Sequence, residues 1–103
     1  MSIKVRDPLG TTVLLREERL LHIIYRHPEL KNREHLILDA VRNPLELYKD
    51  DRGCFHSIAE SDVISDYLVV IYCREGEVGI IRTSYFISRR RKERRYRWFR
   101  RLI

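Results

Sequence analysis

Apolar side chains recur at helical spacing in two stretches near the start of the chain. Residues 16–27 and residues 33–42 each place their apolar side chains on one face. Pro28 ends the first stretch, because a proline disfavours helical geometry in the residue before it. Pro44 ends the second stretch, and Asn32 is predicted to be its N-cap. The pattern therefore predicts two helices.

Beyond Pro44 the spacing changes to that of strands. Apolar runs or alternations occupy residues 45–49, 54–59, 67–73 and 78–87, separated by turn-forming residues at 50–53 and 74–77. A short strand is predicted at 3–6, before a turn at 7–10, and a helix at 89–101. This order predicts an α+β fold with two N-terminal helices packed on a four-stranded antiparallel sheet, followed by a basic C-terminal helix.

The length and composition fit one small globular domain. The chain has 103 residues, of which 44% are hydrophobic, so a domain over 1–88 is expected, with 89–103 as a basic helix or arm of the same domain. No apolar run reaches the roughly 18 residues of a membrane span, and residues 1–10 lack the apolar core of a secretory signal. A cytoplasmic protein without a membrane partner is expected, with Cys54 and Cys73 as reduced thiols.

The positive charge of the chain is concentrated at its end. The sequence has 21 basic and 15 acidic residues, a net charge of +6. Residues 89–101 (RRRKERRYRWFRR) alone carry a net charge of +8, which leaves −2 for the other 90 residues. Aromatic residues alternate with these charges, a pattern typical of nucleic-acid binding. The residues expected to contact RNA here are Arg89, Arg90, Arg91, Arg94, Arg95, Arg97 and Trp98.

Three polar residues near the end of the first predicted helix are candidates for a functional site. His22 and Arg26 are i, i+4 neighbours on its polar side, whereas His27 falls at the edge of the apolar face and should lean toward the last strand. Histidine titrates near neutral pH and can transfer protons. The alternatives are a solvated pair for His22 and Arg26, and capping of the helix dipole for His27.

The last predicted strand carries a second polar cluster. Strand alternation predicts that Thr83 and Tyr85 share a face with Ile81, while Arg82 shares the opposite face with Ser84. A guanidinium in an apolar strand is costly to bury unless it is paired, so Arg82 either pairs with an acid or binds an anion such as phosphate. Ordinary cross-strand polar pairs at a sheet edge are the alternative.

Several of these residues lie in stretches that resemble a known family. The stretch His22–Leu30 (HIIYRHPEL) resembles the HIxxRHPEL signature of small phage and bacterial proteins grouped with the barnase, EndoU, colicin and RelE type nucleases. Residues 40–48 (AVRNPLELY), 68–70 (LVV) and 82–86 (RTSYF) resemble later segments of that family. Together these stretches cover most of residues 13–88. Arg16 and Ser84 depart from the threonine and alanine common in the family.

The resemblance implies two N-terminal helices on a four-stranded antiparallel sheet and metal-independent RNA cleavage by a toxin paired with an antitoxin. It also implies a cleft lined by His22, Arg26 and His27 together with Arg82, Thr83 and Tyr85. In such a reaction a base takes the proton of the ribose 2′-OH, and an acid protonates the leaving oxygen. The expected roles are proton transfer for His27 with Tyr85 or His22, a phosphate clamp for Arg82 and an orienting hydroxyl for Thr83.

Two other functions fit the same sequence. The basic segment alone would suit a nucleic-acid-binding module without catalysis. The second alternative is an interaction domain that docks an acidic antitoxin. Its docking surface would be an apolar stripe formed by Tyr96, Phe99 and Ile103. No cofactor is expected, since the chain lacks glycine-rich phosphate loops, and Cys54 and His56 lack the paired spacing of a zinc site.

Overall fold

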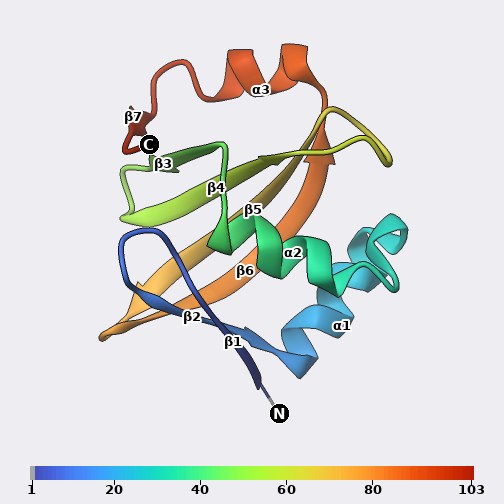
Figure 1. Cartoon of the computed structure of the whole chain (residues 1–103), viewed down its shortest axis with the longest axis vertical. Helices are drawn as coiled ribbons and strands as arrows, with labels where there is room; N and C mark the ends of the chain where they lie inside the picture. Colours follow the sequence, from blue (N-terminus) through green and yellow to red (C-terminus); the bar gives the residue numbers. More distant parts are fainter. Residues whose placement is uncertain (1) are drawn as a thin grey trace.

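The computed structural model describes residues 2–103, which form one mixed sheet with helices on both faces (Figure 1). The strand order is β1-β2-β6-β5-β4-β3-β7. The strands are β1 (Ser2–Arg6), β2 (Thr12–Arg16), β3 (Glu46–Lys49), β4 (Cys54–Glu60), β5 (Tyr67–Glu75), β6 (Val78–Ile87) and β7 (Arg100–Arg101). The helices are α1 (Glu17–Arg26), the 3-10 turn η1 (Pro28–Leu30), α2 (Glu34–Arg42) and α3 (Arg89–Arg95).

The predicted four-stranded antiparallel sheet is therefore wrong. Strands β3 to β6 do form an antiparallel meander, but β1 and β2 extend it at one edge and β7 at the other. The sheet is mixed, because β2 runs parallel to β6. The sequence analysis missed β2, which is five residues long and joins α1 without an intervening turn. Val13 and Leu15 of this strand are fully buried against the helices.

Two further predictions about helix ends are also wrong. Asn32 is not the N-cap of α2: it has a positive φ of 64°, and Arg33 takes the capping position without a side-chain hydrogen bond. The last helix ends at Arg95 rather than at residue 101. Tyr96 and Phe99 turn toward the sheet, and β7 then pairs with β3, so backbone hydrogen bonds of the strand replace those of a longer helix.

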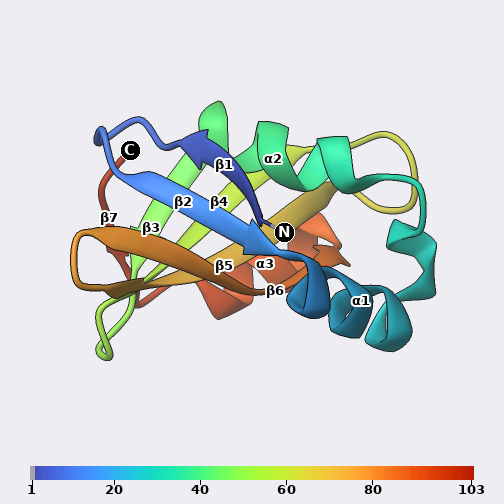
Figure 2. The same ribbon diagram turned by 90° about the horizontal axis from the view of Figure 1, so that it is seen from below.

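Side chains on the two faces of the sheet build separate apolar clusters. Alternate residues of β5 show this: Leu68, Val70 and Tyr72 belong to the cluster beneath α1 and α2. Tyr67, Val69 and Ile71 belong to the cluster beneath α3. Figure 2 shows α2 and α3 on opposite sides of the sheet. We call the side covered by α3 the α3 face, because the candidate site lies there.

Helix α1 lies beside the second half of β6. Strand β2 pairs only with the first residues of β6, from Thr12 opposite Val78 to Leu14 opposite Ile80. Beyond that point, no strand within residues 2–103 pairs with β6 on this side. Helix α1 continues directly from β2 and contacts β6 there (Figure 2). The end of α1 is thereby brought next to the end of β6.

A buried ion pair fixes α3 to the sheet. Lys92 Nζ donates to both carboxylate oxygens of Glu46 in β3, each at 2.9 Å, and Tyr48 donates to Glu46 Oε1 at 2.6 Å. Ser88 begins the helix, since its hydroxyl accepts the Arg91 N–H. The C-terminal segment is thus part of the packed domain.

A β-bulge changes which residues of β6 share a face. Thr83 pairs with Ile71 and Ile81 pairs with Tyr72, so Arg82 is an extra residue in the ladder. Ile81 consequently packs beneath α1 and α2, whereas Tyr85 packs on the α3 face. The predicted sharing of one face by Ile81, Thr83 and Tyr85 is therefore wrong, although Thr83 and Tyr85 do point the same way.

The two cysteines form a disulfide, which corrects the expectation of reduced thiols. Cys54 and Cys73 lie directly opposite each other in the β4–β5 ladder, with 4.2 Å between their Cα atoms. The pairing depends on strand register, which a sequence separation of 19 residues does not reveal. Within residues 2–103, no helix has the length and apolar character needed to cross a membrane.

Candidate functional site

A cationic groove of about 540 Å³ runs between the end of β6 and α3. Tyr85, Phe86 and Ile87 line it from β6, and three arginines line it from α3: Arg91, Arg94 and Arg95. The arginines are spaced i, i+3 and i+4, which places them on one side of the helix. We call this hollow the Tyr85 groove. Its size and charge suit a sugar–phosphate unit of a nucleic acid.

His27 approaches the groove from the end of α1. It caps α1 by donating its backbone N–H to the Ile23 carbonyl at 2.7 Å, and Pro28 then turns the chain into η1. Its ring centroid lies 6.0 Å from that of Tyr85, and its side chain is one-third exposed. The expectation that His27 leans toward the last strand is confirmed.

Glu29 adds an acid to this corner, which the sequence analysis did not single out. Its Oε1 lies 4.0 Å from Nδ1 of His27. This oxygen is buried and has no hydrogen-bond partner among residues 2–103. A buried carboxylate oxygen without a hydrogen bond is unusual. A His27 tautomer with its proton on Nδ1 would be attracted to this carboxylate oxygen. The other ring nitrogen, Nε2, would then be free to face a ligand.

Tyr85 is held by an arginine from the other wall. Arg95 Nη1 donates to the Tyr85 hydroxyl, and its guanidinium carbon lies 5.4 Å from the centre of the Tyr85 ring. The Tyr85 phenol is therefore close both to the guanidinium groups of the groove and to the imidazole of His27, which does not itself line the groove. Such a set can transfer protons and stabilise the negative charge of a phosphate.

The other predicted catalytic residues are distributed differently. Arg82 forms an exposed ion pair with Glu75 at 3.1 Å and does not line the groove, so the first of its two expected alternatives applies. Thr83 is half-buried on the face of Tyr85. His22 and Arg26 are exposed on α1 and line no part of the groove.

The remaining basic residues spread around α3 outside the groove. Arg90 and Arg97, with Arg94 and Glu93, line a shallow hollow beside it, and the main chain of Arg89 donates to Asp66. Trp98 is 87% exposed, with the Arg97 guanidinium 5.7 Å from its ring centre. The predicted apolar docking stripe is wrong, because Tyr96 is only 3% exposed and packs on the sheet with Phe99.

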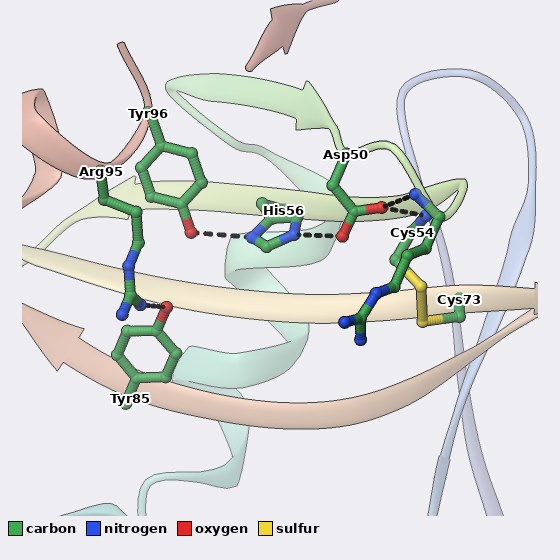
Figure 3. Close-up of polar contacts among 8 residues, drawn as sticks. Asp50, Cys54, His56, Cys73, Tyr85, Arg95 and Tyr96 are labelled. Carbon is green, nitrogen blue, oxygen red and sulfur yellow. Dashed lines mark hydrogen bonds and ion pairs between the residues drawn. A yellow bond between two sulfur atoms is a disulfide. The ribbon is translucent and has the colours of Figure 1, made fainter. Parts of the chain in front are cut away.

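Sequence reasoning also missed a buried polar chain behind the groove, formed by Asp50, His56 and Tyr96 (Figure 3). The His56 ring lies 2.8 Å from the Tyr96 hydroxyl through Nδ1 and 3.0 Å from Asp50 Oδ2 through Nε2. Its three members are separated by up to 46 positions in the sequence. The alternation of β4 places His56 on the α3 face, but only the docking of α3 adds Tyr96.

Residues 2–103 contain no group of three or more His, Cys, Asp or Glu side chains arranged to hold a metal ion. Comparison of the chain with protein-family models, with curated proteins and with solved structures gave no match.

Proposed function

We propose that the chain is a metal-independent endoribonuclease, the toxin of a toxin–antitoxin pair, and that it cleaves RNA in the Tyr85 groove. The observation that carries this proposal is an open hollow lined by Tyr85 and three α3 arginines, with the His27 ring centroid 6.0 Å from that of Tyr85. The motifs resembling the barnase, EndoU, colicin and RelE type nucleases run through β6, which lines the groove, and through the end of α1, which precedes His27. Helix α3 supplies the positive charge.

The reaction proceeds by attack of a ribose 2′-OH on the adjacent phosphorus. His27 and Tyr85 are the proton-transfer pair: one accepts the 2′-OH proton, and the other protonates the departing 5′-oxygen. Arg91, Arg94 and Arg95 stabilise the negative charge that develops on the phosphate oxygens. They take the role that the sequence suggested for Arg82, which is already paired with Glu75. No step requires a metal ion.

The toxin role and the cytoplasmic site of action follow from the resemblance and from the RNA substrate. An acidic antitoxin would neutralise the protein by covering the α3 arginines. Because Tyr96 and Phe99 pack on the sheet, such a partner would contact the charged outer side of α3 and the exposed Trp98 instead. Binding there would close the groove by direct competition with RNA.

The proposal is tested by replacing His27 with alanine. We expect the rate of RNA cleavage in EDTA to fall by roughly 10²–10⁴-fold, the usual contribution of a proton-transfer group. RNA affinity should change little, since the arginines that bind phosphate remain. Gel analysis of a labelled oligonucleotide measures cleavage, and fluorescence anisotropy measures binding.

His35→Ala is the matched control, because His35 is an exposed histidine on α2, which packs on the opposite face of the sheet. It should cleave at the wild-type rate. If the His27→Ala and His35→Ala proteins both cleave RNA as fast as the wild type, His27 is not part of the reaction and the groove is misassigned.

A further inference from the structure

Trp98 is held out in solvent by the turn that joins α3 to β7 (Figure 1). The Phe99 N–H donates to the Tyr96 carbonyl at 3.2 Å, so Arg97 and Trp98 are the two central residues of this turn. Tyr96 is buried on the sheet, and Phe99 packs half-buried beside it. Trp98 itself is 87% exposed. Two packed aromatic residues therefore fix the turn and leave the indole ring open.

Arg97 places a positive charge at this ring. Its guanidinium carbon lies 5.7 Å from the centre of the Trp98 ring, and both side chains are exposed. An open indole stacks on a flat aromatic ligand, and a guanidinium pairs with phosphate. A nucleotide offers both groups, a base with a free face and a phosphate. The pair therefore has the chemistry of a site for one nucleotide of a single strand.

A second hollow connects this pair to the Tyr85 groove. Its volume is about 300 Å³, and the residues that line it are Arg90, Glu93, Arg94 and Arg97. Arg94 also lines the Tyr85 groove, so the two hollows adjoin along α3. Three guanidinium groups face one carboxylate in the second hollow, which leaves it positive. The cationic surface thus runs from the Tyr85 groove over Arg94 to Arg97 and Trp98.

An isolated exposed aromatic residue is common on protein surfaces and needs no ligand to explain it. Tyr25 is such a residue: it is 83% exposed on α1 and, within residues 2–103, lines neither hollow. Trp98 differs because a packed turn fixes its position and because Arg97 joins it to the groove. An acidic protein could also pair with these arginines. Continuity with the groove favours one polyanion that occupies both places.

We propose that Trp98 and Arg97 form a base-stacking subsite, and that the strand cleaved in the Tyr85 groove passes over Arg94 to reach it. This inference rests on the proposed ribonuclease function and names the substrate class as single-stranded RNA. Bases of a duplex are already stacked and paired with one another, so they have no free face for the indole. The substrate must also be long enough to occupy the groove and the subsite together.

Tryptophan fluorescence measures the stacking directly, because Trp98 is the only tryptophan of the chain. The probe is a single-stranded oligonucleotide in which 2′-deoxyribose replaces every ribose, so that it binds without supplying the nucleophile. We expect its binding to quench the fluorescence. An abasic copy keeps the sugar–phosphate chain, and a duplex keeps its bases paired. Both should bind to the arginines without quenching.

Trp98→Ala tests the contribution of the ring to affinity, and the exposed position makes it a mild change for the fold. Fluorescence anisotropy of the labelled probe should show a Kd that rises by about 5- to 150-fold, the usual effect of losing one base–aromatic stack. The Kd of the abasic copy should not change. Trp98→Phe keeps a ring and should lose less affinity. Tyr25→Ala is the matched control and should stay within about twofold of the wild type.

Substrate length shows whether the subsite is connected to the groove. With a hexanucleotide RNA, Trp98→Ala should raise KM by the same factor as Kd and leave kcat unchanged, because a contact remote from the reacting atoms is lost. A dinucleotide fills the groove but does not reach Trp98, so its KM and kcat should match those of the wild type. Equal losses with both substrates would overturn the subsite.

The stacking measurement separates the subsite from the ribonuclease function. Quenching as strong with the abasic copy as with the complete probe would overturn stacking, and so would an unchanged Kd for Trp98→Ala. The exposed indole would then be left for a protein partner. RNA that is cleaved by a protein whose fluorescence is not quenched overturns the subsite alone. Quenching by the probe, with RNA left intact in EDTA, overturns the ribonuclease function and supports the subsite as a nucleic-acid contact.

Discussion

Buried polar side chains on the α3 face have pKa values shifted from their ordinary ones. Burial raises the pKa of Glu46, but hydrogen bonds from Tyr48 and Lys92 outweigh it and hold the pKa below 4.5. Burial and the Glu46 carboxylate raise the pKa of Tyr48 to about 12. Burial lowers the pKa of His56. Burial raises the pKa of Asp50, but hydrogen bonds from His56 and from the backbone N–H groups of Cys54 and Arg52 outweigh burial and lower this pKa. The native state therefore favours neutral His56 and Tyr48 together with ionised Glu46 and Asp50.

These shifts predict how stability depends on pH. Below the ordinary histidine value of 6.5, the unfolded chain binds a proton at residue 56 before the native protein does, so the free energy of unfolding falls. It falls further below 4.5, where unfolded Glu46 is protonated and native Glu46 is not. Above 10.0 the unfolded chain loses the Tyr48 proton that the native protein retains to about 12, and stability falls again.

Urea unfolding at a series of pH values measures this dependence. The expected curve is level between about pH 7 and 10 and declines on both sides. A free energy of unfolding that increases from pH 7 to pH 5 would contradict the buried, neutral state assigned to His56.

The local sequence predicted the positions of only some residues of the candidate site. His27 could be placed beside the last strand, because its position at the edge of a helical face and before Pro28 is readable from a few residues. The partners of His56 could not, because Asp50 reaches it across a hairpin and Tyr96 only through the docking of α3. The sequence predicted that Arg82 pairs either with an acidic side chain or with an anion. It could not decide between these two partners, because the direction of the Arg82 side chain depends on the bulge in β6.

Among the elements, the β4–β5 pair has a covalent link as well as a hydrogen-bonded ladder. The Cys54–Cys73 disulfide closes a loop of 19 residues, for which loop-closure entropy predicts a stabilisation of about 3 kcal/mol. Replacing both cysteines by serine should lower the free energy of unfolding by that amount. Urea unfolding with and without a reductant provides the measurement.

The serine variant also supplies the control for that experiment. Reductant should lower the stability of the wild type and leave the double-serine protein unchanged. Two thiols that react with a thiol reagent in the native, unreduced protein would show that the disulfide does not form.

The sequence predicted strands β1 and β3 to β6 but not β2 or β7. Strands β3 to β6 are apolar runs separated by turn residues, and that pattern depends on neighbouring residues alone. Strand β7 is defined by a distant partner, through two residue pairs with β3. Strand β2 pairs with β1 across the turn at 7–10 as well as with the distant β6, so a hairpin after the predicted strand at 3–6 was the local signal for it. No residue near Arg95 marks the end of α3, because the contacts of Tyr96 and Phe99 with the sheet decide it.

For the whole molecule, the uneven distribution of charge is the dominant feature. The segment 89–101 carries a net charge of +8 and is folded against the sheet, where Lys92 and Tyr96 are buried. Its free arginines therefore form a fixed surface next to the Tyr85 groove. A preorganised positive surface attracts polyanions and also holds them in a defined position. This combination is what a nuclease needs and what a flexible basic tail lacks.

The chemistry of the RNA products tests the central claim most directly. The purified protein is incubated in EDTA with an RNA oligonucleotide, and with a copy in which every ribose is replaced by 2′-deoxyribose. The account predicts that the RNA is cut to fragments ending in a 2′,3′-cyclic phosphate and that the deoxy copy stays whole, because the 2′-oxygen is the nucleophile. Cleavage of both oligonucleotides would contradict this mechanism, and RNA that is bound but left intact would show a binding module without catalysis.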